Sequence, residues 1–187
     1  MKRRWLWLVL AIVLLDGVLG VSWYRHSREA RQDGAILAAA RRYNVEPALV
    51  KAVVWRESRF NPTVRGRAGE LGLMQIREAA AHEWADAERI ADFQFSHLLD
   101  PSTNTLAGTW YLAKLLKRYP LTDNATAYAL ADYNAGRTHV LRWNQDAAAT
   151  NSTAFISQIT FPGTKKYVGN VQQRRDHYRD RGFGKEK

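Results

Sequence analysis

The N-terminal segment constrains this chain most strongly, because it leaves roughly 150 residues for a single compact domain. Lys2-Arg3-Arg4 precede an apolar run, and the span from Trp5 to Tyr24 covers 20 residues with Asp16 as its one charged side chain. As a helix this span is about 30 Å long, which matches the hydrocarbon core of a bilayer. Aromatic residues at both ends of the span suit the two membrane interfaces.

Three interpretations of this segment remain open. A membrane anchor with its basic end in the cytoplasm would export the rest of the chain. A cleavable signal peptide has the same charged start, and Val18-Leu19-Gly20 fits a cleavage site. A buried helix of a soluble protein explains neither the basic start nor the aromatic ends, while Asp16 weakens the anchor. We therefore expect residues 1–24 to be an anchor or signal segment. The chain is then anchored in the inner membrane with its domain in the periplasm, or exported after signal cleavage.

The remaining sequence predicts a polar linker over residues 25–34 and one mainly α-helical domain over residues 35–187. Pro47 suits the first turn of a helix, and Leu49, Val50, Val53 and Val54 follow at helical spacing. Asp100-Pro101 is a strong helix start. No convincing alternating strand is present. The helices that we expect cover residues 36–43, 47–58, 78–88, 101–116, 125–133, 138–145 and 152–159, with a last one after Pro162-Gly163.

Composition excludes several kinds of site. The chain has no cysteine, so disulfides, thiolate metal ligands and a cysteine nucleophile are impossible. No His, Asp or Glu cluster has metal-ligand spacing and no phosphate-loop motif occurs, so we expect neither a metal nor a cofactor. The formal charge of +10 favours polyanions such as anionic lipid or an acidic cell-wall polymer. No nucleic-acid-binding motif is present, and we expect no nucleic-acid partner.

Glu57 is the first candidate for chemistry. It closes the apolar helix that contains Val53, Val54 and Trp55, and a glycine-rich loop follows it. Partial desolvation and the negative end of the helix dipole both favour a protonated carboxyl, which raises its pKa. A carboxyl that is protonated near neutral pH is what general-acid attack on a glycosidic oxygen requires. A Glu in the last turn of a helix is usually only a solvated residue, so its position alone is weak evidence.

Three segments strengthen this interpretation by occurring together and in order. They are Glu57-Ser58-Arg59-Phe60-Asn61-Pro62, then Gly69-Glu70-Leu71-Gly72-Leu73-Met74-Gln75-Ile76, then Ala131-Asp132-Tyr133-Asn134-Ala135-Gly136. With them the chain resembles the catalytic domain of the soluble-lytic-transglycosylase type, a relative of goose-type lysozyme, from about Ala35 to Tyr178. The resemblance implies a lysozyme-like helical fold with the catalytic Glu at a helix end.

The resemblance also implies the reaction and its partners. The enzyme would cleave the β-1,4 bond between N-acetylmuramic acid and N-acetylglucosamine in peptidoglycan glycan strands without consuming water. Glu57 would protonate the linking oxygen, then accept the proton of the muramoyl 6-hydroxyl as that oxygen attacks C1, which gives a 1,6-anhydro product. Such a lyase serves cell-wall remodelling or opens gaps for secretion machinery, so these are candidate partners.

Three more residues match the substrate-binding positions of the family. Tyr133 would orient Glu57 or the sugar, although it is also a candidate core tyrosine. Gln75 matches a residue that hydrogen-bonds the sugar, with capping of its own loop as the alternative. Asn134 either binds substrate or shapes the turn.

The chain departs from the family pattern on both sides of the second segment. Gly66 stands where many relatives carry Ser, Glu70 where Ala is usual, and Arg77-Glu78 where Met-Pro is common. Near the C-terminus, the segment from Phe161 to Val168, which ends in Tyr167-Val168, resembles the family's Pro-Glu-Thr-Arg-x-Tyr-Val, with Gly163 and Lys165 in place of its Glu and Arg. Glu70 leaves open a muramidase that hydrolyses the same bond, since a second carboxylate across the cleft can activate water. A catalytically idle wall-binding module is a third hypothesis.

Overall fold

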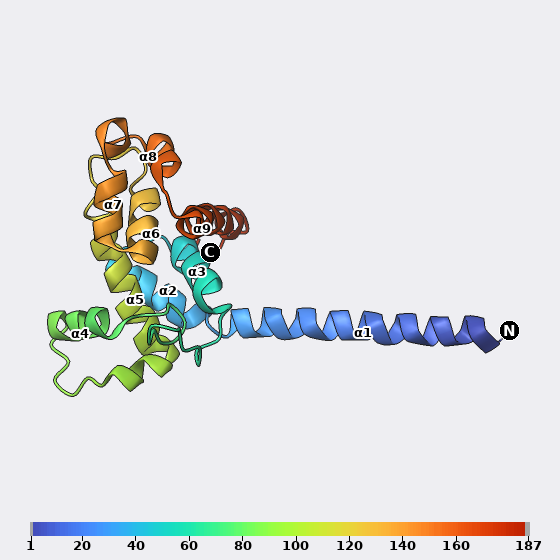
Figure 1. The fold of residues 1–187 in the computed structure, drawn as a ribbon. Coiled ribbons are helices and arrows are strands. Elements are labelled where there is room, and N and C mark those ends of the chain that lie inside the picture. Colours follow the sequence, from blue (N-terminus) through green and yellow to red (C-terminus); the bar gives the residue numbers. More distant parts are fainter. Residues whose placement is uncertain (1, 186–187) are drawn as a thin grey trace.

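The computed structural model describes residues 2–185, and it confirms the mainly α-helical fold (Figure 1). Within that range there is no β-strand, and isolated bridges join Leu71 to Arg65 and to Ile76. Each helix expected in the domain is present, with ends that differ by up to three residues. In chain order the helices are α1 (Lys2–Ala30), α2 (Asp33–Tyr43), α3 (Pro47–Ser58), α4 (Glu78–Ala87), the 3-10 helix η1 (Phe95–Leu99), α5 (Pro101–Leu116), α6 (Ala125–Ala135), α7 (Arg137–Trp143), the 3-10 helix η2 (Asp146–Ala149), α8 (Ser152–Gln158) and α9 (Pro162–Asp180).

The N-terminal helix α1 projects away from the other helices (Figure 1). Its apolar side chains are exposed, including Trp7 at 69% and Trp23 at 72%. An 18-residue window in this helix has a mean hydropathy of 1.9, and none of it is buried in the structure. By length and composition it can cross a membrane, and a signal sequence has the same properties.

The residues expected to form a polar linker are largely helical, because α1 continues to Ala30 and α2 begins at Asp33. The buried side chain of Lys51 on α3 holds this junction. Its ammonium lies 3.2 Å from a carboxylate oxygen of Glu29 and 2.7 Å from one of Asp33. It also lies 4.1 Å from the ring centroid of Phe183, near the C-terminal end. The end of α1, the start of α2 and the C-terminal residue Phe183 therefore all contact the buried ammonium of Lys51.

Helix α3 is the centre of the domain and packs against α2 and α9 (Figure 1). Pro47 occupies its first turn, as the sequence predicts, and every residue from Ala48 to Val54 is buried. Burial of each large aliphatic side chain here stabilises the fold by about 1.5–3 kcal/mol. The helix stops where Arg59 adopts a left-handed conformation with φ 53°. This packing places Glu57 in the last turn of a helix that the domain holds rigidly.

The loop between α3 and α4 is irregular and is held by one buried amide. The Asn104 side chain donates to the carbonyls of Leu71 (2.9 Å) and Leu98 (2.8 Å) and accepts from the Met74 amide (2.8 Å). Gly72 has φ 77°, and a Cβ there would lie 2.1 Å from Nδ2 of Asn104, so only glycine fits. Asn104 on α5 thus sets the position of the Gly69–Ile76 segment.

Candidate active site

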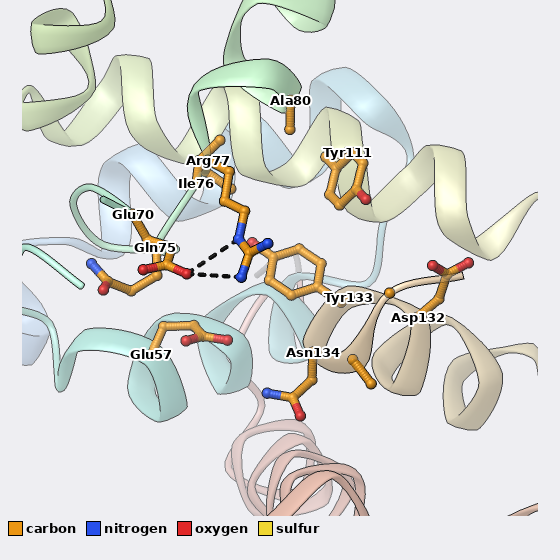
Figure 2. Close-up of a pocket in the computed structure, with 12 residues that line it drawn as sticks. Glu57, Glu70, Gln75, Ile76, Arg77, Ala80, Tyr111, Asp132, Tyr133 and Asn134 are labelled. Atoms are coloured by element: carbon orange, nitrogen blue, oxygen red, sulfur yellow. Dashed lines mark hydrogen bonds and ion pairs between the residues drawn. The ribbon is translucent and has the colours of Figure 1, made fainter. Parts of the chain in front are cut away.

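A groove of about 360 Å³ runs between the end of α3, this loop and α6, a size typical of ligand sites (Figure 2). It brings together the four residues expected from the sequence, namely Glu57, Gln75, Tyr133 and Asn134. The other residues that line it are Glu70, Ile76, Arg77, Ala80, Tyr111, Asp132, Ala135 and Gly136.

Glu57 has the surroundings of a proton-holding carboxyl. Burial raises its pKa above the usual value for a glutamate, and the negative charge of Glu70 raises it further. A hydrogen bond from Tyr167 and the charge of Arg56 act in the opposite direction but do not cancel the effect of burial. The raised pKa favours the protonated form of Glu57, which is the form that can donate a proton to a bound substrate.

Tyr167 is a site residue that sequence reasoning missed. Its hydroxyl donates a 2.6 Å hydrogen bond to Oε1 of Glu57, from a helix 110 residues further along the chain. Burial, together with the charge of Glu57, raises the pKa of Tyr167 well above that of a free tyrosine, so it remains a donor. The sequence gives a signal for it, because Tyr167-Val168 belongs to the C-terminal segment that resembles the family.

Tyr133 lies in the groove, but its hydroxyl does not hold Glu57. It donates instead to the carbonyl of Met74 at 2.7 Å, and its ring packs on that of Tyr111 with centroids 5.6 Å apart. The bond ties α6 to the loop across the groove. Tyr133 therefore lines and shapes the groove, and the tyrosine that hydrogen-bonds Glu57 is Tyr167.

The amide of Gln75 serves its own loop. With φ 50°, Gln75 directs Nε2 to the carbonyls of Val64 (3.1 Å) and Gly72 (2.9 Å). Gln75 also lines the groove, and its Oε1 can accept a hydrogen bond from a substrate N–H or O–H. Loop capping and sugar binding are thus compatible in one side chain.

Asn134 is exposed at the other end of the groove. Its Oδ1 accepts a hydrogen bond from Thr164 at 2.8 Å, which links α6 to the start of α9. Its Nδ2 remains available to a ligand.

Glu70 and Gly66, two of the departures from the family pattern, compensate for one another in space. A Cβ on Gly66 would lie 2.2 Å from Oε2 of Glu70 and 2.8 Å from Oε1 of Gln75, so the Glu70 carboxylate fills the room that a residue-66 side chain would need. The same carboxylate accepts hydrogen bonds from the Ala68 amide (3.0 Å) and from Arg77 (3.2 Å). Figure 2 shows this ion pair on the side of the groove that faces Glu57.

The electrostatic state of Glu70 differs from that of Glu57. Burial alone would raise the pKa of Glu70, but hydrogen bonds from backbone amides and from Arg77 outweigh it and lower the pKa. The lowered pKa favours the ionised form of Glu70, and each of its carboxylate oxygens accepts a hydrogen bond. Asp132, the third carboxylate of the groove, is buried and bonded to Tyr119 (2.7 Å) and Arg118 (3.0 Å). In residues 2–185 no three His, Asp or Glu side chains gather closely enough to hold a metal ion.

A helical domain with a buried glutamate of raised pKa at a helix end, beside an open groove, is typical of the lysozyme-like class of folds. Within that class the chain belongs to the transglycosylase SLT domain family, whose model matches residues 34–156. The soluble lytic murein transglycosylase of Salmonella typhimurium is 33% identical over 73% of this chain and 21% of its own length. The membrane-bound lytic murein transglycosylase F of Desulfosudis oleivorans is 30% identical over 85% of this chain and 33% of its own length. The chain thus spans about a fifth to a third of the curated relatives it matches.

Solved structures agree with this assignment. The 70 kDa soluble lytic transglycosylase of Escherichia coli superposes with a TM-score of 0.68 at 30% identity, over 78% of this chain and 24% of that one. The lytic transglycosylase Slt of Pseudomonas aeruginosa, solved as an inactive mutant, has a TM-score of 0.73 at 24% identity over 82% of this chain and 24% of its own. The latter likeness concerns the fold alone.

Proposed function

We propose that this protein is a peptidoglycan lytic transglycosylase that cleaves the bond between N-acetylmuramic acid and N-acetylglucosamine, with Glu57 as its acid and then its base. The observation that carries the proposal is the buried Glu57 carboxyl, whose raised pKa and hydrogen bond from Tyr167 keep a proton-bearing group fixed in the groove. The names of the relatives, soluble and membrane-bound lytic murein transglycosylases, support the same activity.

The geometry supports a cycle in which one carboxyl moves two protons. Glu57 gives its proton to the glycosidic oxygen as the bond to C1 of the muramoyl residue breaks, and the N-acetylglucosamine leaves with a free hydroxyl. The muramoyl 6-oxygen then bonds to C1, and its proton passes to Glu57. The products are a 1,6-anhydro sugar and an enzyme in its starting protonation state, so no water is consumed. In this cycle Gln75, Tyr133 and Asn134 bind the strand and Tyr167 positions Glu57.

Hydrolysis is the second candidate, because Glu70 lies in the same groove. Against it, the Glu70 carboxylate already accepts hydrogen bonds from Ala68 and Arg77, which leaves it a weak base for activating water. Mass spectrometry of sacculi digested by the purified full chain tests both candidates. We expect anhydro-muropeptides. Products heavier by one water, with reducing ends, would show hydrolysis, and no release would favour a wall-binding module.

We propose further that α1 stays in the inner membrane and holds the domain in the periplasm. Its exposed apolar surface and interfacial aromatic residues support an anchor, as does the membrane-bound relative. The test is the mass and location of the mature chain. A chain that starts near residue 21 and is soluble after export would show that the segment is a cleaved signal.

A further inference from the structure

An unusual concentration of positive charge lies where α1, the end of α3 and α9 meet. We call Arg25, Arg56, Arg59 and Arg174 the arginine cluster. The guanidinium carbons of Arg59 and Arg174 lie 3.6 Å and 4.1 Å from the ring centroid of Trp55. Arg56 is held 5.3 Å from the ring of Tyr167 in the same way. Aromatic rings thus fix these guanidinium groups in place and leave their N–H donors unused.

No carboxylate forms an ion pair with the cluster. Among residues 2–185, no carboxylate oxygen lies within 4.0 Å of a nitrogen of these four guanidinium groups, although six arginine–carboxylate pairs occur elsewhere. Glu29, the acidic residue of the same turns of α1, pairs with Lys51 instead. Partial burial, and then the charges of Arg56, Arg174 and Arg25, lower the pKa of Arg59. Like charges held this closely are stabilised by a bound anion.

The position of the cluster along α1 indicates which kind of anion binds to it. Arg25 directly follows Trp23 and Tyr24, the exposed aromatic residues that end the apolar span. The headgroup layer of a bilayer is about 5–7 Å thick on each side of the hydrocarbon core. At 1.5 Å per residue, the next four or five residues of α1 cross about that depth. Groups that pack against this part of α1 therefore lie at the level of lipid phosphates.

We propose that the arginine cluster is a binding site for the phosphate of an anionic phospholipid in the leaflet from which α1 emerges. The inference rests on the proposed membrane anchor, and it adds a second ligand outside the groove, because none of the four arginines lines the groove. Guanidinium groups bind phosphate oxygens through paired N–H donors, and two of them, on Arg59 and Arg174, are held against the same Trp55 ring. Bound lipid would hold the groove at one orientation to the membrane.

Carboxylates of the peptidoglycan stem peptides are the alternative occupant, since Arg56 neighbours Glu57. The lipid is favoured because Arg174, a member of the cluster, lines a surface pocket together with His26 and Glu29 of the anchor helix. A stem peptide that reached Arg25 would have to enter the headgroup layer.

Native mass spectrometry of the full chain, released from nanodiscs that contain equal amounts of phosphatidylglycerol and phosphatidylcholine, tests the proposal. The wild type is expected to retain phosphatidylglycerol in preference. The Arg59→Gln/Arg174→Gln variant is expected to retain about 25-fold less, because each cation at an anionic surface contributes a factor of about five. Arg41→Gln/Arg142→Gln is the matched control, since it removes two exposed charges from α2 and α7 and should leave the preference intact.

Release of anhydro-muropeptides by the same preparations separates this inference from the proposed function. Equal retention of the two lipids by an enzyme that releases anhydro products overturns the lipid site alone. A lipid preference without release overturns the enzymatic proposal alone. Lost release with unchanged lipid retention in Arg59→Gln/Arg174→Gln would assign the cluster to stem peptides, and thermal melting confirms that each variant is folded.

Discussion

The two walls of the groove each carry a glutamate, and the pKa values of the two carboxyls are shifted in opposite directions. Glu57 stands at the end of the buried helix α3 and contacts one neutral donor, the hydroxyl of Tyr167. Glu70 stands on a loop and accepts hydrogen bonds from a backbone amide and a guanidinium. The pKa of the first is raised and that of the second is lowered, although both face the same space. Burial raises the pKa of Glu57, whereas at Glu70 the backbone amides and the Arg77 guanidinium outweigh burial and lower the pKa.

In the proposed mechanism, the wall that carries Glu57 performs the acid chemistry, and the wall that carries Glu70 positions the substrate. A lysozyme-type hydrolase needs a second carboxylate that is free to act on water or on the sugar. Here the second carboxylate already accepts hydrogen bonds from Ala68 and Arg77, and it occupies the room beside Gly66. The following variants test that division, from the largest expected effect to the smallest.

Replacing Glu57 by Gln removes the group that the contrast depends on. Glu57→Gln is expected to lower the rate of anhydro-muropeptide release by about 10²–10⁴-fold, the usual contribution of a general acid and base. The variant should be more stable than the wild type at alkaline pH. A buried carboxyl with a raised pKa destabilises the folded state when it ionises as pH rises, and Gln does not ionise. Release rates and thermal melting at two pH values measure both effects, and full activity would refute the assignment.

Removing the Tyr167 hydroxyl changes the state of Glu57 without removing it. Tyr167→Phe is expected to slow release on the order of tenfold, since a hydrogen bond to a charged group contributes about 1.5–3 kcal/mol. That bond lowers the pKa of Glu57, so its loss raises the pKa further. Activity requires protonated Glu57 and should therefore persist to higher pH in the variant. An unchanged pH profile would mean that Tyr167 only fills space. Tyr133→Phe is the control, because the hydroxyl of Tyr133 donates to the Met74 carbonyl and not to Glu57.

A side chain at position 66 should disturb the other wall. Gly66→Ala places a methyl group against the Glu70 carboxylate and the Gln75 amide, at a cost of about 1–3 kcal/mol in stability and with a several-fold rise in KM. Gly163→Ala is the control, since nothing lies within 4 Å of its Cβ. The paired change Gly66→Ser/Glu70→Ala restores the family pattern and should recover most of the loss. If it does not, the two departures are unrelated.

Neutralising Glu70 should have the smallest effect. Glu70→Gln is expected to keep the release rate within about twofold, because Glu57 alone moves the protons. The negative charge of Glu70 raises the pKa of Glu57, so the alkaline loss of activity should move to slightly lower pH. A large fall in rate, with reducing-end products in the wild type, would instead give Glu70 the water-activating role.

Local signals were sufficient to predict the fold. Pro47 and Asp100-Pro101 mark two helix starts where the structure has them, and aliphatic spacing identifies the buried face of α3. Glu57 could be found because it lies within a contiguous segment of the family pattern. The end of α1 was harder to predict from the sequence. Glu29 and Asp33 resemble residues of a polar linker, and only the structure shows that both pair with the buried Lys51.

Contacts between distant segments could not be predicted in the same way. The bond from Tyr167 to Glu57 joins residues 110 positions apart, so no local pattern encodes it. The same holds for Tyr133, whose partner is a backbone carbonyl that could belong to any residue of the loop. Gly66 and Glu70 were each recognised as departures, but their compensation becomes visible only when the loop is folded.

The Lys51 junction limits what the proposed anchored enzyme can reach. With Glu29 at the end of α1 and Asp33 at the start of α2 fastened to one buried ammonium, the catalytic unit stands on a rigid stalk. It can search sideways as the stalk diffuses in the bilayer, but its working height above the membrane is constant. Glycan strands outside that thin layer must come to the enzyme as the wall moves or is built.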